Sequence, residues 1–141
     1  LLHSVEKDFS SHPSSGNNQL VLTIQPDLPE ISADPERLIQ VVTNLISNAE
    51  RHTRNGTITI SLTGEPGWQT ICVSDTGTGM SEEMQKNALK GYVSADKDYW
   101  RHGIGLYVCH QIITAHGGKI WLKSKEGEGT QVFFSLPEEE S

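Results

Sequence analysis

The stretch DPERLIQVVTNLISNAERH, residues 34–52, decides the fold of this chain. Asp34 followed by Pro35 is a typical helix start, because an aspartate side chain caps the first free amides and proline fits the first turn. Apolar residues then recur at helical spacing and predict one buried stripe on a helix that ends near His52. The stripe consists of Leu38, Val41, Val42, Leu45, Ile46 and Ala49.

Runs with alternating apolar residues predict strands on both sides of this helix. Glycines between the second and third runs indicate a hairpin, and further helices are expected over residues 81–90 and 104–115, with a loop over 92–101 between them. This order predicts an α+β fold, a two-layer sandwich in which about three helices cover one face of a mixed, mostly antiparallel sheet. The expected strands are residues 20–24, 57–63, 69–74, 119–124 and 131–136.

The bulk composition fits one compact domain, since 35% of 141 residues are hydrophobic. We expect residues 1–19 to be the end of a preceding helix and a linker, 20–137 the domain, and 138–141 a solvated tail. The net charge of −7 argues against a nucleic-acid surface, which needs a basic footprint. No apolar run has the length of a bilayer span, so any membrane anchor would lie outside this chain. Cys72 and Cys109 form no CxxC pair and predict buried reduced thiols, which suits the cytoplasm.

Polar residues form a second strip on the helix of residues 34–52. Asn44, Asn48, Arg51 and His52 fall on one side of it and can face one ligand. Carboxamide oxygens are hard donors that suit Mg²⁺, and neutral ones suffice where phosphates and water supply the other ligands. Asn48 is therefore the predicted metal ligand. An isolated asparagine pair is more often just an exposed polar pair, so the prediction depends on the motifs that follow.

The motif DTGTGM, residues 75–80, comes directly after a strand-like run. Asp75 therefore lies at a strand end, and Gly77 and Gly79 permit close approach of backbone. A carboxylate in this place can accept a hydrogen bond from an amine. Taken alone, the motif fits an ordinary strand-to-helix turn equally well, because aspartate and glycine are common in turns.

The motif HGIGL, residues 102–106, places Gly103 and Gly105 where a helix is expected to begin. Free N–H groups and the positive end of the helix dipole would then point outward, which favours a polyphosphate. Arg101 and Lys97 precede the motif and offer cationic groups to such phosphates, although both also fit solvated loop charges.

Together with HGGKIWLKSKEGEGT from His116, these motifs resemble the ATP-binding catalytic domain of sensor histidine kinases, within the wider GHKL group of ATPases and kinases. The resemblance runs from about Leu20 to Pro137. It implies the α+β sandwich described above with an ATP lid loop, ATP as ligand and Mg²⁺ as its metal. The double glycine after His116 ends a helix and begins a strand, so this histidine is expected at a helix end and not as a catalyst.

The resemblance also implies roles for single residues. Asn48 chelates Mg²⁺ and Asn44 supports it. Arg51 stands where a phosphate-contacting lysine is usual, and His52 stands where an aromatic residue stacks on adenine. Asp75 accepts the exocyclic amine of adenine and selects against guanine, which presents a carbonyl there.

Further residues of the nucleotide pocket follow from the same resemblance. Thr130, in the closing Gly-x-Gly-Thr strand, contacts the adenine side near the acid, directly or through water. Arg101 replaces a usual glycine and is expected to clamp the γ-phosphate, with Lys97 as a weaker candidate. The family usually has an aromatic box, a phenylalanine-rich stretch between the two glycine motifs. This stretch is not recognisable here, and Tyr92 is expected to substitute for part of it. The phosphate-binding stretch comprises His102, Gly103, Ile104, Gly105 and Leu106.

The resemblance leads to one expected reaction, because water-activating members of the group need a carboxylate base one turn before the metal asparagine. That place holds Asn44, so transfer to a histidine is favoured over hydrolysis. None of the six histidines matches the family's acceptor motif. The acceptor is therefore expected on a separate domain of the same, homodimeric protein, with a response regulator as the next partner and no membrane contact by this domain.

Three alternatives stay open. A degenerate ATP-sensing domain without turnover fits the missing aromatic box and Arg101. A serine kinase of the anti-sigma type would need an acid near the asparagines, and Glu50 faces away from them. A gyrase-like ATPase would need a carboxylate base at the position where this chain has Asn44.

Overall fold

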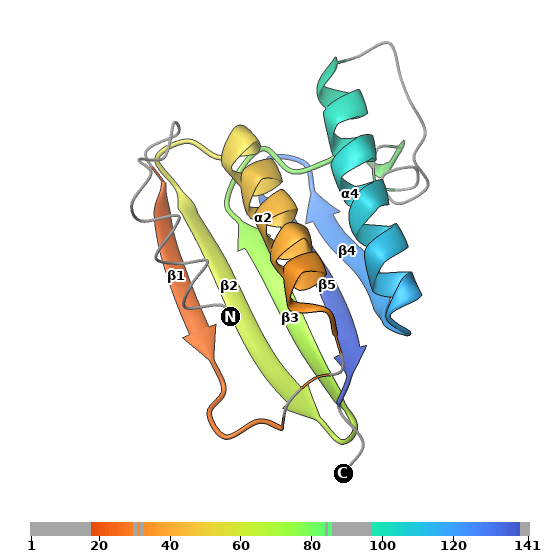
Figure 1. Cartoon of the computed structure of the whole chain (residues 1–141). Coiled ribbons are helices and arrows are strands. Elements are labelled where there is room, and N and C mark those ends of the chain that lie inside the picture. Colours follow the sequence, from red (N-terminus) through yellow and green to blue (C-terminus); the bar gives the residue numbers. More distant parts are fainter. Residues whose placement is uncertain (1–17, 30, 32, 84, 86–96, 139–141) are drawn as a thin grey trace.

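The computed structural model of the chain describes residues 18–29, 31, 33–83, 85 and 97–138, and for 97–105 it describes the backbone only. Five strands form one sheet in the order β1-β2-β3-β5-β4, and two named helices cover one of its faces (Figure 1). β1 and β2 run parallel, whereas the other neighbours are antiparallel, so the predicted mixed, mostly antiparallel sheet is confirmed. The elements are β1 (Gln19–Ile24), α2 (Pro35–His52), β2 (Thr57–Glu65), β3 (Trp68–Asp75), α4 (Lys97–Ala115), β4 (Lys119–Lys125) and β5 (Gly129–Pro137).

The core lies between the sheet and the helix layer, as the apolar stripe predicts. All six stripe residues of α2 are buried, and the alternating apolar residues of the central strands meet them. Asp34 caps α2 as expected, because its Oδ1 accepts from the Glu36 amide at 3.0 Å. The deepest members on the sheet side are Ile58, Ile60, Val73, Phe134 and Leu136.

α4 begins earlier than the sequence predicts. Its first residue is Lys97, and the expected start was Ile104, so the last residues of the predicted loop belong to the helix and residues 92–96 lie outside the described ranges. Gly103 and Gly105 consequently lie inside α4. Two glycines cost roughly 1 kcal/mol each in a helix. No proline interrupts the preceding residues, and the buried packing of the rest of α4 holds the helix in place.

The described residues contain two named helices, fewer than the roughly three expected. The predicted helix at 81–90 is represented by one turn, in which the Gln85 amide donates to the Ser81 carbonyl at 3.0 Å. The remainder, residues 86–90, lies outside the description. Within the described ranges, neither helix has the length and hydropathy needed to cross a membrane.

The two helices run antiparallel and side by side (Figure 1). A histidine joins their ends. The Nε2 atom of His116, just past α4, accepts the backbone amide of Asp34 at 3.2 Å, and its Nδ1 lies 2.8 Å from the Ile112 carbonyl. Gly117, with φ of +76°, then reverses the chain into β4. His116 is thus a helix-end residue, as predicted.

Candidate functional site

One row across the sheet brings three polar residues together. Asp75 at the end of β3 pairs with Thr130 of β5, and Thr130 pairs with Ser124 of β4. Paired residues of neighbouring strands point to the same side of a sheet. Val132, two residues after Thr130, is buried in the core beneath the helices. The three polar side chains therefore lie on the helix-covered face.

The Asp75 carboxylate is held in place by backbone donors. Its Oδ1 accepts from the Gly77 amide at 2.9 Å and from the Thr130 amide at 3.3 Å. An ionised carboxylate has about four acceptor positions, so it can also accept from an amine of a ligand. The acid is thus oriented before any ligand arrives, at the strand end where the sequence places it.

The glycines of residues 75–80 permit close backbone approach, as predicted, and the partner is the protein's own backbone. A methyl group on Gly77 would overlap the carbonyl of His52 at the end of α2. A methyl group on Gly79, which has φ of +70°, would overlap the carbonyl of Lys125. The Thr78 amide also donates to the His52 carbonyl at 3.0 Å. The loop is therefore clamped between α2 and the turn after β4.

Two asparagines of α2 face different surroundings one turn apart. The Asn44 side chain donates a hydrogen bond to the thiol of Cys109 on α4, which places Asn44 at the contact between the helices. Asn48 is 7% exposed, and its Oδ1 is buried without a hydrogen-bond partner among the described residues. Because the helices are antiparallel, one turn further along α2 corresponds to one turn earlier on α4, at the level of Gly105. By this spacing, Asn48 lies on the α4 side of α2, at about the level of the predicted phosphate stretch.

An unpaired buried oxygen is costly, by about 1–3 kcal/mol. This amide oxygen can serve as a ligand for a hard cation, with phosphates and water completing the coordination of the metal. The described residues contain no group of three or more His, Cys, Asp or Glu that could hold a metal by themselves. The donor chemistry at Asn48 thus fits a metal that arrives with a polyphosphate.

The other predicted site residues are described to different extents. On α2, Arg51 is exposed and His52 is half-buried beside the 75–80 loop. Lys97, Arg101 and the stretch from His102 to Gly105 are placed as helix backbone, Leu106 is fully buried in the core, and Tyr92 lies outside the described residues. Sequence patterns missed Ser124, because only the pairing of β4 with β5 brings it to Thr130.

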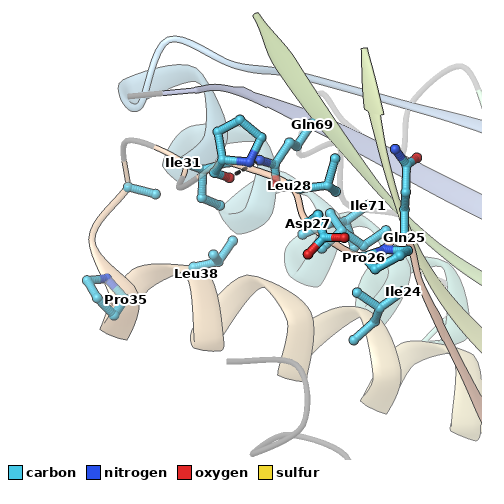
Figure 2. A pocket seen from close by; sticks show the side chains of 13 residues that line it. Ile24, Gln25, Pro26, Asp27, Leu28, Ile31, Pro35, Leu38, Gln69 and Ile71 are labelled. Atoms are coloured by element: carbon cyan, nitrogen blue, oxygen red, sulfur yellow. Dashed lines mark hydrogen bonds between the residues drawn. The ribbon is translucent and has the colours of Figure 1, made fainter. Parts of the chain in front are cut away.

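A separate cavity of ≈ 530 Å³ lies at the opposite end of α2 (Figure 2). Asn48 is about 15 Å further along the helix than Leu38, which lines this cavity. The Gln69 side-chain amide donates to the Pro29 carbonyl and to the Glu138 carboxylate. Both of its protons are therefore bonded within the chain. The cavity walls are mainly apolar, with Gln25, Asp27 and Gln69 as polar members, and they include neither Asp75 nor Asn48. Its walls include Ile24, Leu28, Ile31, Leu38, Leu62 and Ile71.

Comparisons with known proteins identify the family of this chain. The sequence profile of the family described as histidine kinase-, DNA gyrase B-, and HSP90-like ATPase matches residues 33–140, and the chain belongs to this family. The adaptive-response sensory kinase SasA of Synechococcus elongatus is 38% identical over 141 residues, covering 97% of this chain and 36% of that protein. SasA of Prochlorococcus marinus is 40% identical over 119 residues, covering 81% of this chain and 31% of that protein. This chain thus spans about a third of the length of these relatives.

Solved structures give the same result. The catalytic domain of histidine kinase ThkA in a nucleotide-free form matches with a TM-score of 0.83 at 27% identity, over 97% of this chain and 91% of that one. ThkA in complex with response regulator protein TrrA matches with a TM-score of 0.79 at 26% identity, over 98% of this chain and 39% of that one. The resemblance to the catalytic domain of sensor histidine kinases is confirmed.

The Cys109 thiol is predicted to resist alkylation in the folded chain at neutral pH. Burial raises the pKa of this thiol from 9.0 to about 12, and the hydrogen bond from Asn44 offsets only part of that rise. The reactive thiolate is therefore scarce while the chain is folded. Iodoacetamide labelling followed by mass spectrometry, with and without urea, measures this protection.

The same pKa difference predicts how stability depends on pH. The unfolded thiol loses its proton near 9.0 and the folded thiol near 12, so the free energy of unfolding falls as pH rises through this window. Urea unfolding of the Cys109→Ala variant should show a smaller fall. Equal labelling rates in folded and unfolded chain would contradict the buried, neutral thiol.

Proposed function

We propose that this chain binds Mg-ATP and transfers the γ-phosphate to a histidine on a separate dimerisation and phosphoacceptor domain of the same protein. The observation that carries the proposal is that the site holds both an oriented acid and a buried amide oxygen that has no hydrogen-bond partner among the described residues. Asp75 lies at one end of the site, and Asn48 lies at the contact of α2 with α4. Membership of the family supports the same conclusion.

The acid end suits adenine. Asp75 accepts the exocyclic amine, and Thr130 beside it provides a hydroxyl at the same strand end. Guanine would bring a carbonyl against the carboxylate, which leaves two acceptors facing each other. His52, half-buried at the end of α2, is proposed to stack on the purine. Gly77 and Gly79 hold the loop that shapes this end.

The metal end suits Mg²⁺ bound to phosphates. Asn48 supplies one neutral oxygen, and Asn44 holds its own helix against α4 through Cys109. When bound, Mg²⁺ neutralises charge that develops on the phosphates during transfer. Arg51, exposed in the last turn of α2, is proposed to contact a phosphate. Arg101 and, more weakly, Lys97 are proposed to contact the γ-phosphate.

Binding of phosphates at the amides of residues 102–106 requires a change in α4. Gly103 and Gly105 lie within the helix, where amides bond to carbonyls four residues earlier. The anion-binding end of α4 would have to move from Lys97 to Gly103 for these amides to become free. We propose that the triphosphate stabilises this later start, with residues from Tyr92 onward forming the lid.

The residues near Asn48 argue against water activation. A general base is needed one turn earlier, and Asn44 there cannot take a proton. Its neighbour Cys109 is a protonated thiol, because burial raises the pKa to about 12. A neutral imidazole from another domain is a better nucleophile at cytoplasmic pH. Transfer to histidine is therefore favoured over hydrolysis.

We propose that residues 1–19 link the domain at 20–137 to a phosphoacceptor domain of a dimeric kinase. This domain is proposed to lie in the cytoplasm, whether or not the full-length protein carries a membrane anchor. A response regulator is proposed to receive the phosphate from the phosphoacceptor histidine. The names of the sensory kinase relatives and of the ThkA–TrrA complex support this proposal. Nucleic acid is not a proposed partner.

A second candidate is an ATP-sensing domain without turnover. The observation that favours it is the early start of α4, which keeps Gly103 and Gly105 in helical hydrogen bonds. If these residues stay helical with nucleotide present, adenine can bind while the γ-phosphate is left without its donors.

Replacing Asp75 by Asn should weaken ATP binding by about 1.5–3 kcal/mol, because a charge-assisted acceptor is lost. The asparagine oxygen can still accept from the Gly77 and Thr130 amides, so the loop stays in place. Isothermal titration calorimetry gives the affinity. Asp27→Asn is the matched control, an exposed aspartate at φ of 60°, a conformation that asparagine tolerates. Equal affinity of both variants would mean that adenine binds elsewhere.

Replacing Asn48 by Ala should remove the Mg²⁺-dependent part of ATP binding and nearly all transfer. Stability should change little, because the Asn48 oxygen has no protein partner to lose among the described residues and alanine favours helices. Titrations with Mg²⁺ and with EDTA, beside urea unfolding, measure both effects. Ser47→Ala, exposed on the same helix, is the control. An unchanged Mg²⁺ dependence would disprove the metal assignment.

Transfer itself separates the candidate functions. With radiolabelled ATP and an added histidine-bearing hairpin domain from a sensor kinase, the label should appear on the hairpin and be absent when that histidine is replaced by glutamine. Release of free phosphate without an acceptor would instead indicate an ATPase. Binding without transfer or release would indicate the ATP-sensing domain.

A further inference from the structure

Ser124 connects the two sides of the acid end. Its Oγ accepts the Met80 amide at 2.8 Å, donates to the Gly129 carbonyl at 2.9 Å, and lies 2.8 Å from Oγ1 of Thr130. Met80 follows the DTGTG loop, which begins at Asp75, and Gly129 begins β5. One hydroxyl therefore ties the loop after β3 to the strand that carries Thr130.

The number of protons in this cluster decides which hydroxyl donates. A serine hydroxyl has one proton and two lone pairs. A carbonyl oxygen can only accept, so the bond to Gly129 uses the single proton of Ser124. Both lone pairs of Ser124 then accept, one from the Met80 amide and one from the Thr130 hydroxyl. The Thr130 proton is consequently directed at Ser124, and the remaining capacity of Thr130 is that of an acceptor.

We propose that Ser124 is a positioning residue for base selection: it holds the Thr130 hydroxyl as an acceptor toward the purine and so discriminates against purines with a carbonyl at C6. The proposal rests on the proposed function, because it takes the purine to lie beside Asp75 and Thr130. Two neighbouring acceptors match an amine, or a water molecule that donates to both. A C6 carbonyl meets lone pairs from both residues. A Thr130 hydroxyl that could rotate would donate to that carbonyl and relieve half of the mismatch.

The test compares ATP with inosine triphosphate, whose base carries a carbonyl in place of the amine. In Ser124→Ala the Thr130 hydroxyl is free to rotate, so the ratio of the two dissociation constants, inosine triphosphate over ATP, should fall by about fivefold or more. Isothermal titration calorimetry measures both constants. Ser74→Ala is the matched control, because Ser74 precedes Asp75 on β3 and points to the opposite face of the sheet.

The double variant separates positioning from general loosening of the loop. If Ser124 acts through the Thr130 hydroxyl, Ser124→Ala should leave the ratio unchanged in a Thr130→Val background. An equal loss of affinity for both nucleotides in Ser124→Ala, or an effect on the ratio that persists in the valine background, would overturn the proposal. Failure of the unaltered chain to bind ATP would instead overturn the proposed function, on which this inference rests.

A measurement on the unaltered chain covers the case in which Ser124→Ala does not fold. Neutron diffraction from deuterated crystals locates hydroxyl deuterons directly. The deuteron between the two oxygens should be bonded to Oγ1 of Thr130, and that of Ser124 should point at the Gly129 carbonyl. A deuteron of Ser124 directed at Thr130 would refute the proposal.

Discussion

The pairing of β3 with β5 in a single register is the constraint on which the site depends. This register places Asp75 opposite Thr130 and directs both toward the helices. Side chains alternate between the two faces of a strand, so a slip of one residue would turn the acid to the opposite face of the sheet. The buried partners on the same strands make such a slip costly, because Val73 and Phe134 would leave the core. Packing of apolar residues thus fixes the position of polar ones.

The two helices are joined to each other at one end and to the loop after β3 at the other. His116 joins the end of α4 to the start of α2, and the carbonyl of His52 at the other end of α2 receives the loop that follows Asp75. Between these points, Asn44 and Cys109 bring the helices into contact. The amide of Asn48 is therefore placed relative to the acid by a rigid frame of strands and helices, which is what a preorganised binding site requires.

Local patterns predicted most of the elements. Every end of the five strands lies within two residues of the predicted bound, because alternation of apolar residues reports directly on two-faced burial. α2 was predicted from its cap to its last turn, since Asp34, Pro35 and the apolar stripe all agree. The predicted start of α4 is wrong, because a glycine pair is typical of a helix boundary but here lies inside the helix. The cost of glycine in a helix is small beside the packing of Leu106 and Cys109, which no local pattern measures.

The sequence by itself determined the fold class and the core of α2, and it predicted the acid and amides of the candidate site, because these depend on short-range spacing and on residue chemistry. Only the tertiary structure decided that the glycines beside Asp75 make room for the protein's own carbonyls, that the buried Asn48 oxygen finds no partner in the described part of the chain, and that Ser124 meets Thr130. These facts depend on which strands pair and on how two helices pack over them. Contacts between residues 44 and 109, or 124 and 80, join segments far apart in the chain, and no local spacing encodes the distance between their atoms.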